Sequence, residues 1–242
     1  MELTFKHFDE VDSTNSALKK LIDAKEGTVL TADYQTGGRG TGTNQWESEH
    51  GKNITGSIVL KPGFLGPSES FLISMAVSVG IAAFVSKFDD TVQIKWPNDI
   101  YLDHKKLAGI LIENEFTANT INRTIAGIGL NVNQTRFKHA PNPIAISQIA
   151  NKKLDIPDLR QKLFNSIYSV YQTLQTAPVK IIKNYHSRLY GKDIRLEFED
   201  VHGRFTGRIQ RVAPDGQLII LDEQNDQRFY YFKEVKMVQV TY

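Results

Sequence analysis

The stretch KWPNDIYLDHKKLAGILIEN, residues 95–114, alternates short apolar segments with polar turns. Pro97-Asn98-Asp99 and His104-Lys105 separate these segments, a pattern that predicts antiparallel strands joined by tight turns. Lys106 begins a strongly apolar strand, so its ammonium group must either reach solvent or meet an anion. Asp99 beside a proline could hold a divalent cation or orient a lysine that binds phosphate. On spacing alone, a solvated hairpin with a lysine at its tip remains the alternative.

Strand and helix patterns extend outward from this stretch in both directions. After a short first strand, strand patterns cover residues 28–35, 53–60, 92–96, 100–102, 107–114 and 124–132. Helical patterns begin near Asn15, ending near Gly27, and cover residues 68–88, 157–176 and 178–189. Within 68–88 the helical spacing predicts one apolar side, formed by Leu72, Met75, Ala76, Val79 and Ala83.

The pattern changes near residue 190, after which no helical periodicity is visible. Short alternating segments follow, separated by His202-Gly203, Asp215-Gly216 and Asn225-Asp226, as in a small β-barrel of about 50 residues. We therefore predict an α+β protein with two domains, residues 1–189 and 190–242.

Composition excludes several classes of protein. The 242 residues carry a net charge of only +2, which disfavours a dedicated nucleic-acid binder, so no DNA partner is expected. The chain contains no cysteine, which removes disulfides, thiolate zinc sites and cysteine nucleophiles. We see no signal peptide and no stretch that approaches the roughly 20 apolar residues of a membrane span. The cytoplasm is the expected location, and no membrane partner is expected.

A glycine-rich loop carries the first candidate chemistry. Gly38-Arg39-Gly40-Thr41-Gly42 can bring its backbone close to a ligand, and successive N–H groups in such a loop can bind an anion. Arg39 adds a permanently charged fork for carboxylate or phosphate, and Trp46 offers a flat face for a heteroaromatic ring. A flexible surface turn with a half-buried tryptophan is the alternative. No Gly-Lys-Ser/Thr follows, so this is not a Walker A loop.

Polar side chains also gather before the first helix. Ser13-Thr14-Asn15 can either cap that helix or bind a polar ligand, and capping alone is the simpler interpretation. The six histidines show no spacing typical of a zinc site.

Taken in order, these segments resemble the biotin protein ligase family, the biotin–[acetyl-CoA-carboxylase] ligases. The resemblance is strong from about residue 5 to 135 and weak beyond. The fold it implies is a mixed, mainly antiparallel sheet flanked by helices, like that of class II aminoacyl-tRNA synthetases, with a small C-terminal SH3-like barrel. It implies a catalytic and a C-terminal domain without the N-terminal DNA-binding domain of some relatives. The motifs that carry it are residues 12–15, Gln35, 38–40, Trp46, 95–99, 106–111 and 127–132.

The resemblance also implies roles for individual residues. Lys106 and Arg39 would be catalytic, and Asp99 would position Mg²⁺. Biotin would contact Ser13, Thr14, Asn15, Gln35, Gly38, Arg39, Gly40, Thr41, Lys106 and Gly109. The nucleotide would contact Arg39, Trp46, Asn98, Lys106 and Asn131.

The implied reaction joins biotin and MgATP into biotinyl-5′-AMP, and then transfers biotin to one lysine of a biotin carboxyl carrier domain. Relatives of this form occur as monomers and as homodimers. Two alternatives stay open. One is a lipoate or octanoate ligase of the related fold. The other is a biotin-binding regulator without turnover, because Thr41 stands where the family usually has arginine or glutamine.

Overall fold

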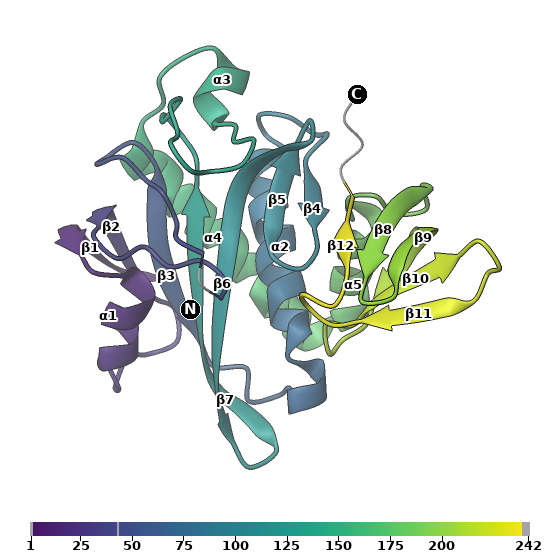
Figure 1. Ribbon diagram of the computed structural model, residues 1–242. Coiled ribbons are helices and arrows are strands. Elements are labelled where there is room, and N and C mark those ends of the chain that lie inside the picture. The colour runs from purple at the N-terminus through teal and green to yellow at the C-terminus, as the bar shows by residue number, and fades with distance from the viewer. Residues whose placement is uncertain (1, 43, 239–242) are drawn as a thin grey trace.

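The computed structural model describes residues 2–42 and 44–238, which form two β-sheets and the helices around them (Figure 1). The larger sheet has seven strands in the order β1-β2-β3-β7-β6-β5-β4. Its strands are β1 (Thr4–Val11), β2 (Thr28–Gln35), β3 (Ile54–Leu60), β4 (Gln93–Lys95), β5 (Asp99–Leu102), β6 (Lys105–Thr117) and β7 (Thr120–Leu130).

The pairing within this sheet is mainly antiparallel. Only β1 and β2 run parallel, and the remaining neighbours, including the predicted meander from β4 to β7, are antiparallel. The mixed, mainly antiparallel sheet is therefore confirmed. Its register places Gly109 opposite both Gly129 on β7 and Asp99 on β5. Three neighbouring strands thus bring turn residues and glycines to one place.

Different helices pack on the two faces of the large sheet. Helices α2 (Phe71–Val85), α4 (Ile156–Thr176) and α5 (Pro178–Ser187) form the main core with one face, while α1 (Thr14–Lys20) lies on the other (Figure 1). Beneath α1 only a small apolar cluster forms, of Leu18, Leu30, Val59 and Ile125. Since side chains alternate along a strand, Gly127 and Gly129 share the α1 face with Ile125. The glycines leave that face open for a site.

Helix α2 corrects two expectations from the sequence. It is buried on almost every side rather than along one stripe, and Ala83, predicted to be buried, is exposed. The 19-residue stretch Pro67–Val85 contains an 18-residue window with a mean hydropathy of 1.7. By length and composition it could cross a membrane, so the expectation of no such stretch was wrong. Within the fold 67% of this window is buried, and a helix enclosed by a core needs apolar residues all round.

Other helix boundaries also differ from prediction. Helix α1 ends at Lys20 rather than near Gly27, and Ile22, which follows it, is 82% exposed. A separate 3₁₀ turn, η1 (Pro67–Glu69), precedes α2, and the short helix α3 (Ile146–Ala150) gave no periodic signal. Five residues are too few to show a helical repeat.

The second sheet lies beside the first and is antiparallel, in the order β11-β10-β9-β8-β12 (Figure 1). It is consistent with the expected SH3-like barrel. Trp96 Nε1 donates to the Gly216 carbonyl oxygen at 2.9 Å, which joins the two parts. The domain boundary at residues 189/190 stays a prediction. The strands are β8 (Leu196–Asp200), β9 (Gly203–Val212), β10 (Leu218–Asp222), β11 (Gln227–Tyr230) and β12 (Lys236–Met237).

Gly80 lets α2 and α4 approach closely. A Cβ on Gly80 would lie 2.6 Å from Ile167 Cα, which is backbone and cannot rotate away. Although alanine favours a helix by about 1 kcal/mol over glycine, overpacking of this kind costs about 1–3 kcal/mol. We expect Gly80→Ala to lower the free energy of unfolding in urea. Gly63→Ala, with nothing within 4 Å of its Cβ, is the control. A variant as stable as the control would contradict the prediction.

His186 links α5 to β9, and its environment predicts that the stability of the fold depends on pH. Burial lowers its pKa below the usual value, although a hydrogen bond to Val212 opposes the change, and the charges of Lys192 and Arg211 lower it further. The unfolded chain therefore binds a proton near pH 6.5 that the folded protein resists, so stability falls as pH drops below about 6.5. We expect the melting temperature of His186→Gln to fall less between pH 7.5 and 5.5 than that of the wild type. Equal slopes would refute this assignment.

Candidate functional site

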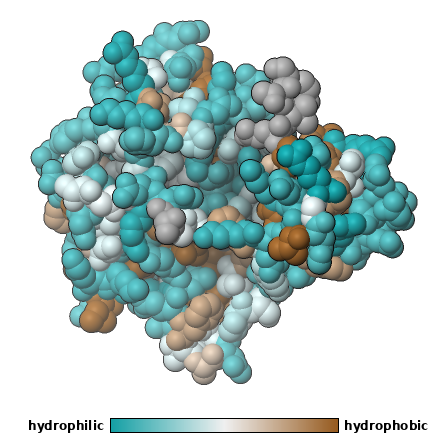
Figure 2. Space-filling view, viewed as in Figure 1, coloured by the Kyte–Doolittle hydropathy of each residue, from teal (hydrophilic) through white to brown (hydrophobic). Residues whose placement is uncertain are grey.

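A cavity of about 190 Å³ opens on the α1 face of the large sheet, at its junction with the second sheet. Figure 2 shows a hollow on this side of the molecule, bordered mostly by hydrophilic residues. The cavity collects residues from α1, the glycine-rich loop, β5, β6 and β7, together with Phe232 of the second sheet's connections. Among the predicted site residues, those that line it are Ser13, Thr14, Asn15, Gln35, Arg39, Gly40, Thr41, Trp46, Asn98, Asp99, Lys106 and Gly109.

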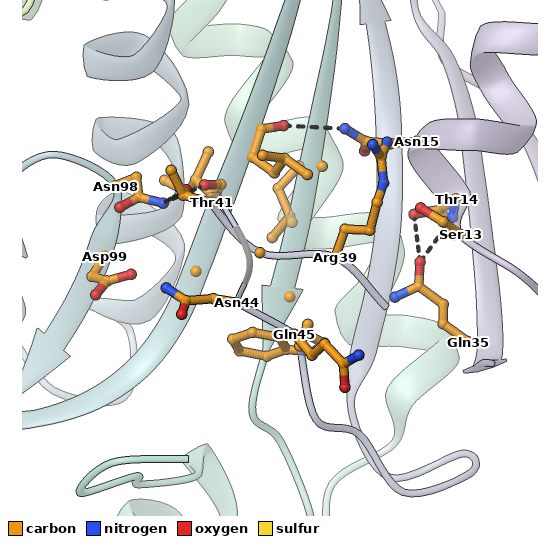
Figure 3. A pocket seen from close by; sticks show the side chains of 18 of the residues that line it. Ser13, Thr14, Asn15, Gln35, Arg39, Thr41, Asn44, Gln45, Asn98 and Asp99 are labelled. Atoms are coloured by element: carbon orange, nitrogen blue, oxygen red, sulfur yellow. Dashed lines mark hydrogen bonds between the residues drawn. The ribbon is translucent and has the colours of Figure 1, made fainter. Parts of the chain in front are cut away.

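Hydroxyl and amide groups form one end of the cavity. Figure 3 shows Ser13, Thr14 and Gln35 together on one side, opposite Asn98 and Asp99. The backbone N–H of Thr14 donates to Gln35 Oε1 at 2.8 Å, and the Thr14 hydroxyl lies 3.1 Å from the same oxygen. Since Gln35 Oε1 is used in this way, its Nε2 is the group left for a ligand acceptor. This end can bind an uncharged polar ligand group.

The glycine-rich loop closes on itself as a small hairpin. Gly40 N–H donates to Asn44 O at 2.8 Å, and Trp46 N–H donates to Gly38 O at 3.0 Å. Asn98 Nδ2 donates to Thr41 Oγ1 at 2.7 Å and to Ile110 O at 2.7 Å, which ties the loop to the turn before β5. The loop therefore forms a wall of the cavity.

Trp46 lies flat against strand backbone within the cavity. A Cβ on Gly129 would lie 2.2 Å from Trp46 Cε2, and one on Gly109 would lie 3.2 Å from Trp46 Cζ3. The indole can take this position only because these two residues lack side chains. Its Nε1 is buried with no hydrogen-bond partner among the described residues. A buried donor without a partner is costly, and it marks a place for a ligand acceptor.

Lysines provide positive charge at the opposite end. Lys106 Nζ lies 2.7 Å from Asp99 Oδ1, and both side chains are about three-quarters buried. Lys95 lies close by on β4. Burial lowers the Lys95 pKa, Asp99 opposes this change, and the charge of Lys106 adds to it. Lys105 points elsewhere and lines a different cavity. One end of the site is therefore cationic, while the other is neutral and polar.

Two predicted site residues do not line the cavity. Gly38 lies where the glycine-rich loop begins, and a Cβ there would meet Trp46 O at 2.7 Å. Asn131 is buried behind Lys106, where its Nδ2 donates to Ile144 O at 3.1 Å and to Lys106 O at 3.4 Å. Asn131 thus holds the backbone that carries Lys106.

The structure adds residues that sequence reasoning missed. Glu113 accepts hydrogen bonds from Arg39 Nη2 at 2.9 Å and from Asn15 Nδ2 at 2.7 Å. Gly129 could have been found, because glycines alternating within a strand indicate close approach of another group. Phe232 has no local signal, since only the packing of the second sheet brings it to the cavity.

The acids around the cavity limit how a metal could bind. Over residues 2–42 and 44–238, no group of three histidines or carboxylates could hold a metal ion. Asp99 is the only carboxylate among the described residues that line the cavity. Mg²⁺ typically binds one or two carboxylates together with substrate phosphates and water, so a single aspartate is compatible with Mg²⁺ brought in by a nucleotide.

The fold and this cavity define a site for a small polar molecule with an anionic end. The family model described as "Biotin/lipoate A/B protein ligase family" matches residues 8–133, and the chain belongs to this family. It is 31% identical over 234 residues to the bifunctional ligase/repressor BirA of Bacillus spizizenii, covering 92% of this chain and 70% of that protein. It is 34% identical over 127 residues to the biotin--[acetyl-CoA-carboxylase] ligase of Paracoccus denitrificans, covering 50% and 51%.

A solved structure agrees on the fold. The biotin protein ligase from Aquifex aeolicus in complex with biotin and ATP superposes with a TM-score of 0.79 at 23% identity. The superposition covers 98% of this chain and 99% of that one, so both sheets take part.

Gly129→Ala tests the packing of Trp46. The added Cβ would lie 2.2 Å from the indole, so the ring must leave the strand backbone. In a Trp96→Phe background Trp46 is the only tryptophan, so excitation selective for tryptophan reports on it alone. We expect red-shifted emission, stronger acrylamide quenching and a stability loss of about 1–3 kcal/mol. Gly63→Ala in the same background is the control, and unchanged quenching would show that the ring does not depend on Gly129.

Proposed function

We propose that this protein is an ATP-dependent biotin protein ligase, which forms biotinyl-5′-AMP and transfers biotin to a lysine of a biotin carboxyl carrier domain. The observation that carries the proposal is the polarity of one cavity. Neutral hydrogen-bonding groups occupy one end, Lys106 provides positive charge at the other, and Arg39 adds a second cation from the loop. Biotin has the same polarity, with a cyclic urea at one end and a carboxylate at the other.

The neutral end suits the urea ring. Gln35 Nε2 is available as a donor to the urea oxygen, while the hydroxyl oxygens of Ser13 and Thr14 can accept from its N–H groups. These side chains are fixed because Ser13 and Thr14 are buried and Thr14 is bonded twice to Gln35. Fixed partners raise affinity, because little side-chain freedom remains to be lost on binding.

The cationic end suits adenylation. When a carboxylate attacks the α-phosphate, two anions approach each other, and preorganised positive charge stabilises the transition state. Lys106 would bridge the carboxylate and the α-phosphate, and Arg39 would reach the same oxygens from the loop. ATP would bring Mg²⁺, for which Asp99 supplies a carboxylate. Trp46 Nε1 and Asn98 are the nearest candidates for adenosine contacts, while Asn131 would act through the backbone of Lys106.

The loop and the second sheet would protect the product. An acyl-adenylate hydrolyses in water, so a wall that closes over it preserves it for transfer. The hairpin formed by residues 38–42 and 44–46 provides that wall on one side, and Phe232 reaches the cavity from the second sheet. We therefore assign residues 1–189 to catalysis and 190–242 to closing the site and receiving the acceptor.

The decisive experiment incubates the protein with labelled biotin, ATP, Mg²⁺ and a biotin carboxyl carrier domain. Pyrophosphate release and label on one carrier lysine are the expected results. Parallel reactions with lipoate or octanoate and a lipoyl domain test the related activity. Turnover with lipoate but not with biotin would identify the protein as a lipoate ligase. Binding of biotin without release of pyrophosphate would identify it as a biotin-binding regulator.

Lys106→Ala tests the proposed catalytic cation. Loss of one preorganised donor to a charged transition state typically reduces the rate about 10²- to 10³-fold, and we expect that reduction in pyrophosphate release. Lys105→Ala is the matched control, because the neighbouring lysine lines a different cavity. Circular dichroism would establish that both variants fold. Similar rates in the two variants would reject the assignment.

A further inference from the structure

A chain of hydrogen bonds runs beneath the cavity from its neutral end. The Thr14 hydroxyl oxygen lies 2.7 Å from Ser57 Oγ, and Ser57 Oγ lies 2.6 Å from Asn15 Oδ1. All three residues are at least 97% buried, so these groups are largely shielded from bulk solvent. The orientation of each group therefore depends on its neighbour in the chain.

Glu113 on β6 ends this chain. Its Oε2 accepts from Asn15 Nδ2 at 2.7 Å and from Arg39 Nη2 at 2.9 Å. A carboxylate only accepts hydrogen bonds, so the Asn15 amide must turn its NH₂ group toward Glu113 and its oxygen toward Ser57. Ser57 then donates its one hydrogen to Asn15 Oδ1. The carboxylate thus sets hydrogen-bond direction as far as Ser57, whose Oγ contacts Thr14 at the neutral end.

The same carboxylate oxygen holds the arginine of the glycine-rich loop. Arg39 is 44% exposed and lies on a loop with few apolar contacts, so its long side chain would otherwise sample many rotamers. The contact with Glu113 uses one Nη2 hydrogen and leaves most of the five guanidinium N–H groups for a ligand. Glu113 therefore orders Arg39 without blocking its anion-binding side.

We propose that Glu113 is a positioning residue, which orients Arg39 for the substrate anion and fixes the amide of Asn15 beneath the ligand's neutral end. This inference rests on the proposed adenylation for its effect on turnover. Its structural part, the tethering of Arg39 in the free protein, does not depend on the substrate.

Glu113→Gln removes the negative charge of the side chain while nearly preserving its shape. The glutamine oxygen can still accept from Asn15, but it lacks the charge that holds Arg39. Glu115→Gln is the matched control, because Glu115 lies two residues further along the same strand, on the same face, and pairs with Arg123 at 3.6 Å. Glu113→Asp keeps the charge and is expected to restore most of the wild-type behaviour, so an unfolded Glu113→Gln protein would not prevent the test.

The first measurement is limited trypsin digestion of the free protein, followed by mass spectrometry of cleavage after Arg39. Trypsin must extract an arginine from its contacts, so loss of the tether should speed this cleavage about tenfold. Glu115→Gln should match the wild type. Equal cleavage after Arg39 in Glu113→Gln, wild type and control would overturn the proposal.

The second measurement is pyrophosphate release with biotin and ATP. We expect Glu113→Gln to lower kcat/KM about tenfold, and to have no further effect in an Arg39→Ala background, because the two residues would act as one unit. Fully additive effects would overturn the positioning role. A wild-type protein that releases no pyrophosphate would overturn the proposed function, while the trypsin result would still decide whether Glu113 tethers Arg39.

Discussion

The site depends on a strip of strand backbone that carries no side chains. Gly109 on β6 pairs with Gly129 on β7, and Gly127 lies on the same face. A Cβ on Gly127 would lie 2.2 Å from Asn15 Oδ1, and one on Gly129 would lie 2.2 Å from Trp46 Cε2. Helix α1 and the glycine-rich loop can therefore rest on the sheet only because these positions are glycines. A side chain at Gly127 would displace Asn15 of α1, and one at Gly129 would displace Trp46 of the loop.

A second feature is that the functional cations have acidic partners within the protein. Lys106 pairs with Asp99, and Arg39 pairs with Glu113. An unpaired cation at a partly buried position loses hydration without compensation, whereas a pair offsets much of that cost. The carboxylates also fix where each cation points, so a substrate anion meets charges that are already ordered. The cost is competition, because a ligand must share each cation with its acidic partner.

Much of the fold was predictable because its signals are local. The meander from β4 to β7 follows from short apolar segments separated by turn residues, and it was confirmed. Errors occurred where tertiary context overrides local pattern. The stripe predicted on α2 disappears because the sheet, α4 and α5 enclose that helix, so its periodicity carries little information. Helix α1 ends early because nothing covers Ile22.

The sequence by itself determined the residue types of the site: hydroxyls before a helix, an arginine between glycines, and a lysine at the start of an apolar strand. These signals are short-range, since spacing within a few residues decides turns, caps and close backbone approach. Only the tertiary structure decided which groups meet. Glu113 reaches Arg39 across 74 positions of chain, and Phe232 arrives from a different sheet. Strand register sets such contacts, and register is fixed by packing of the whole sheet rather than by any one segment.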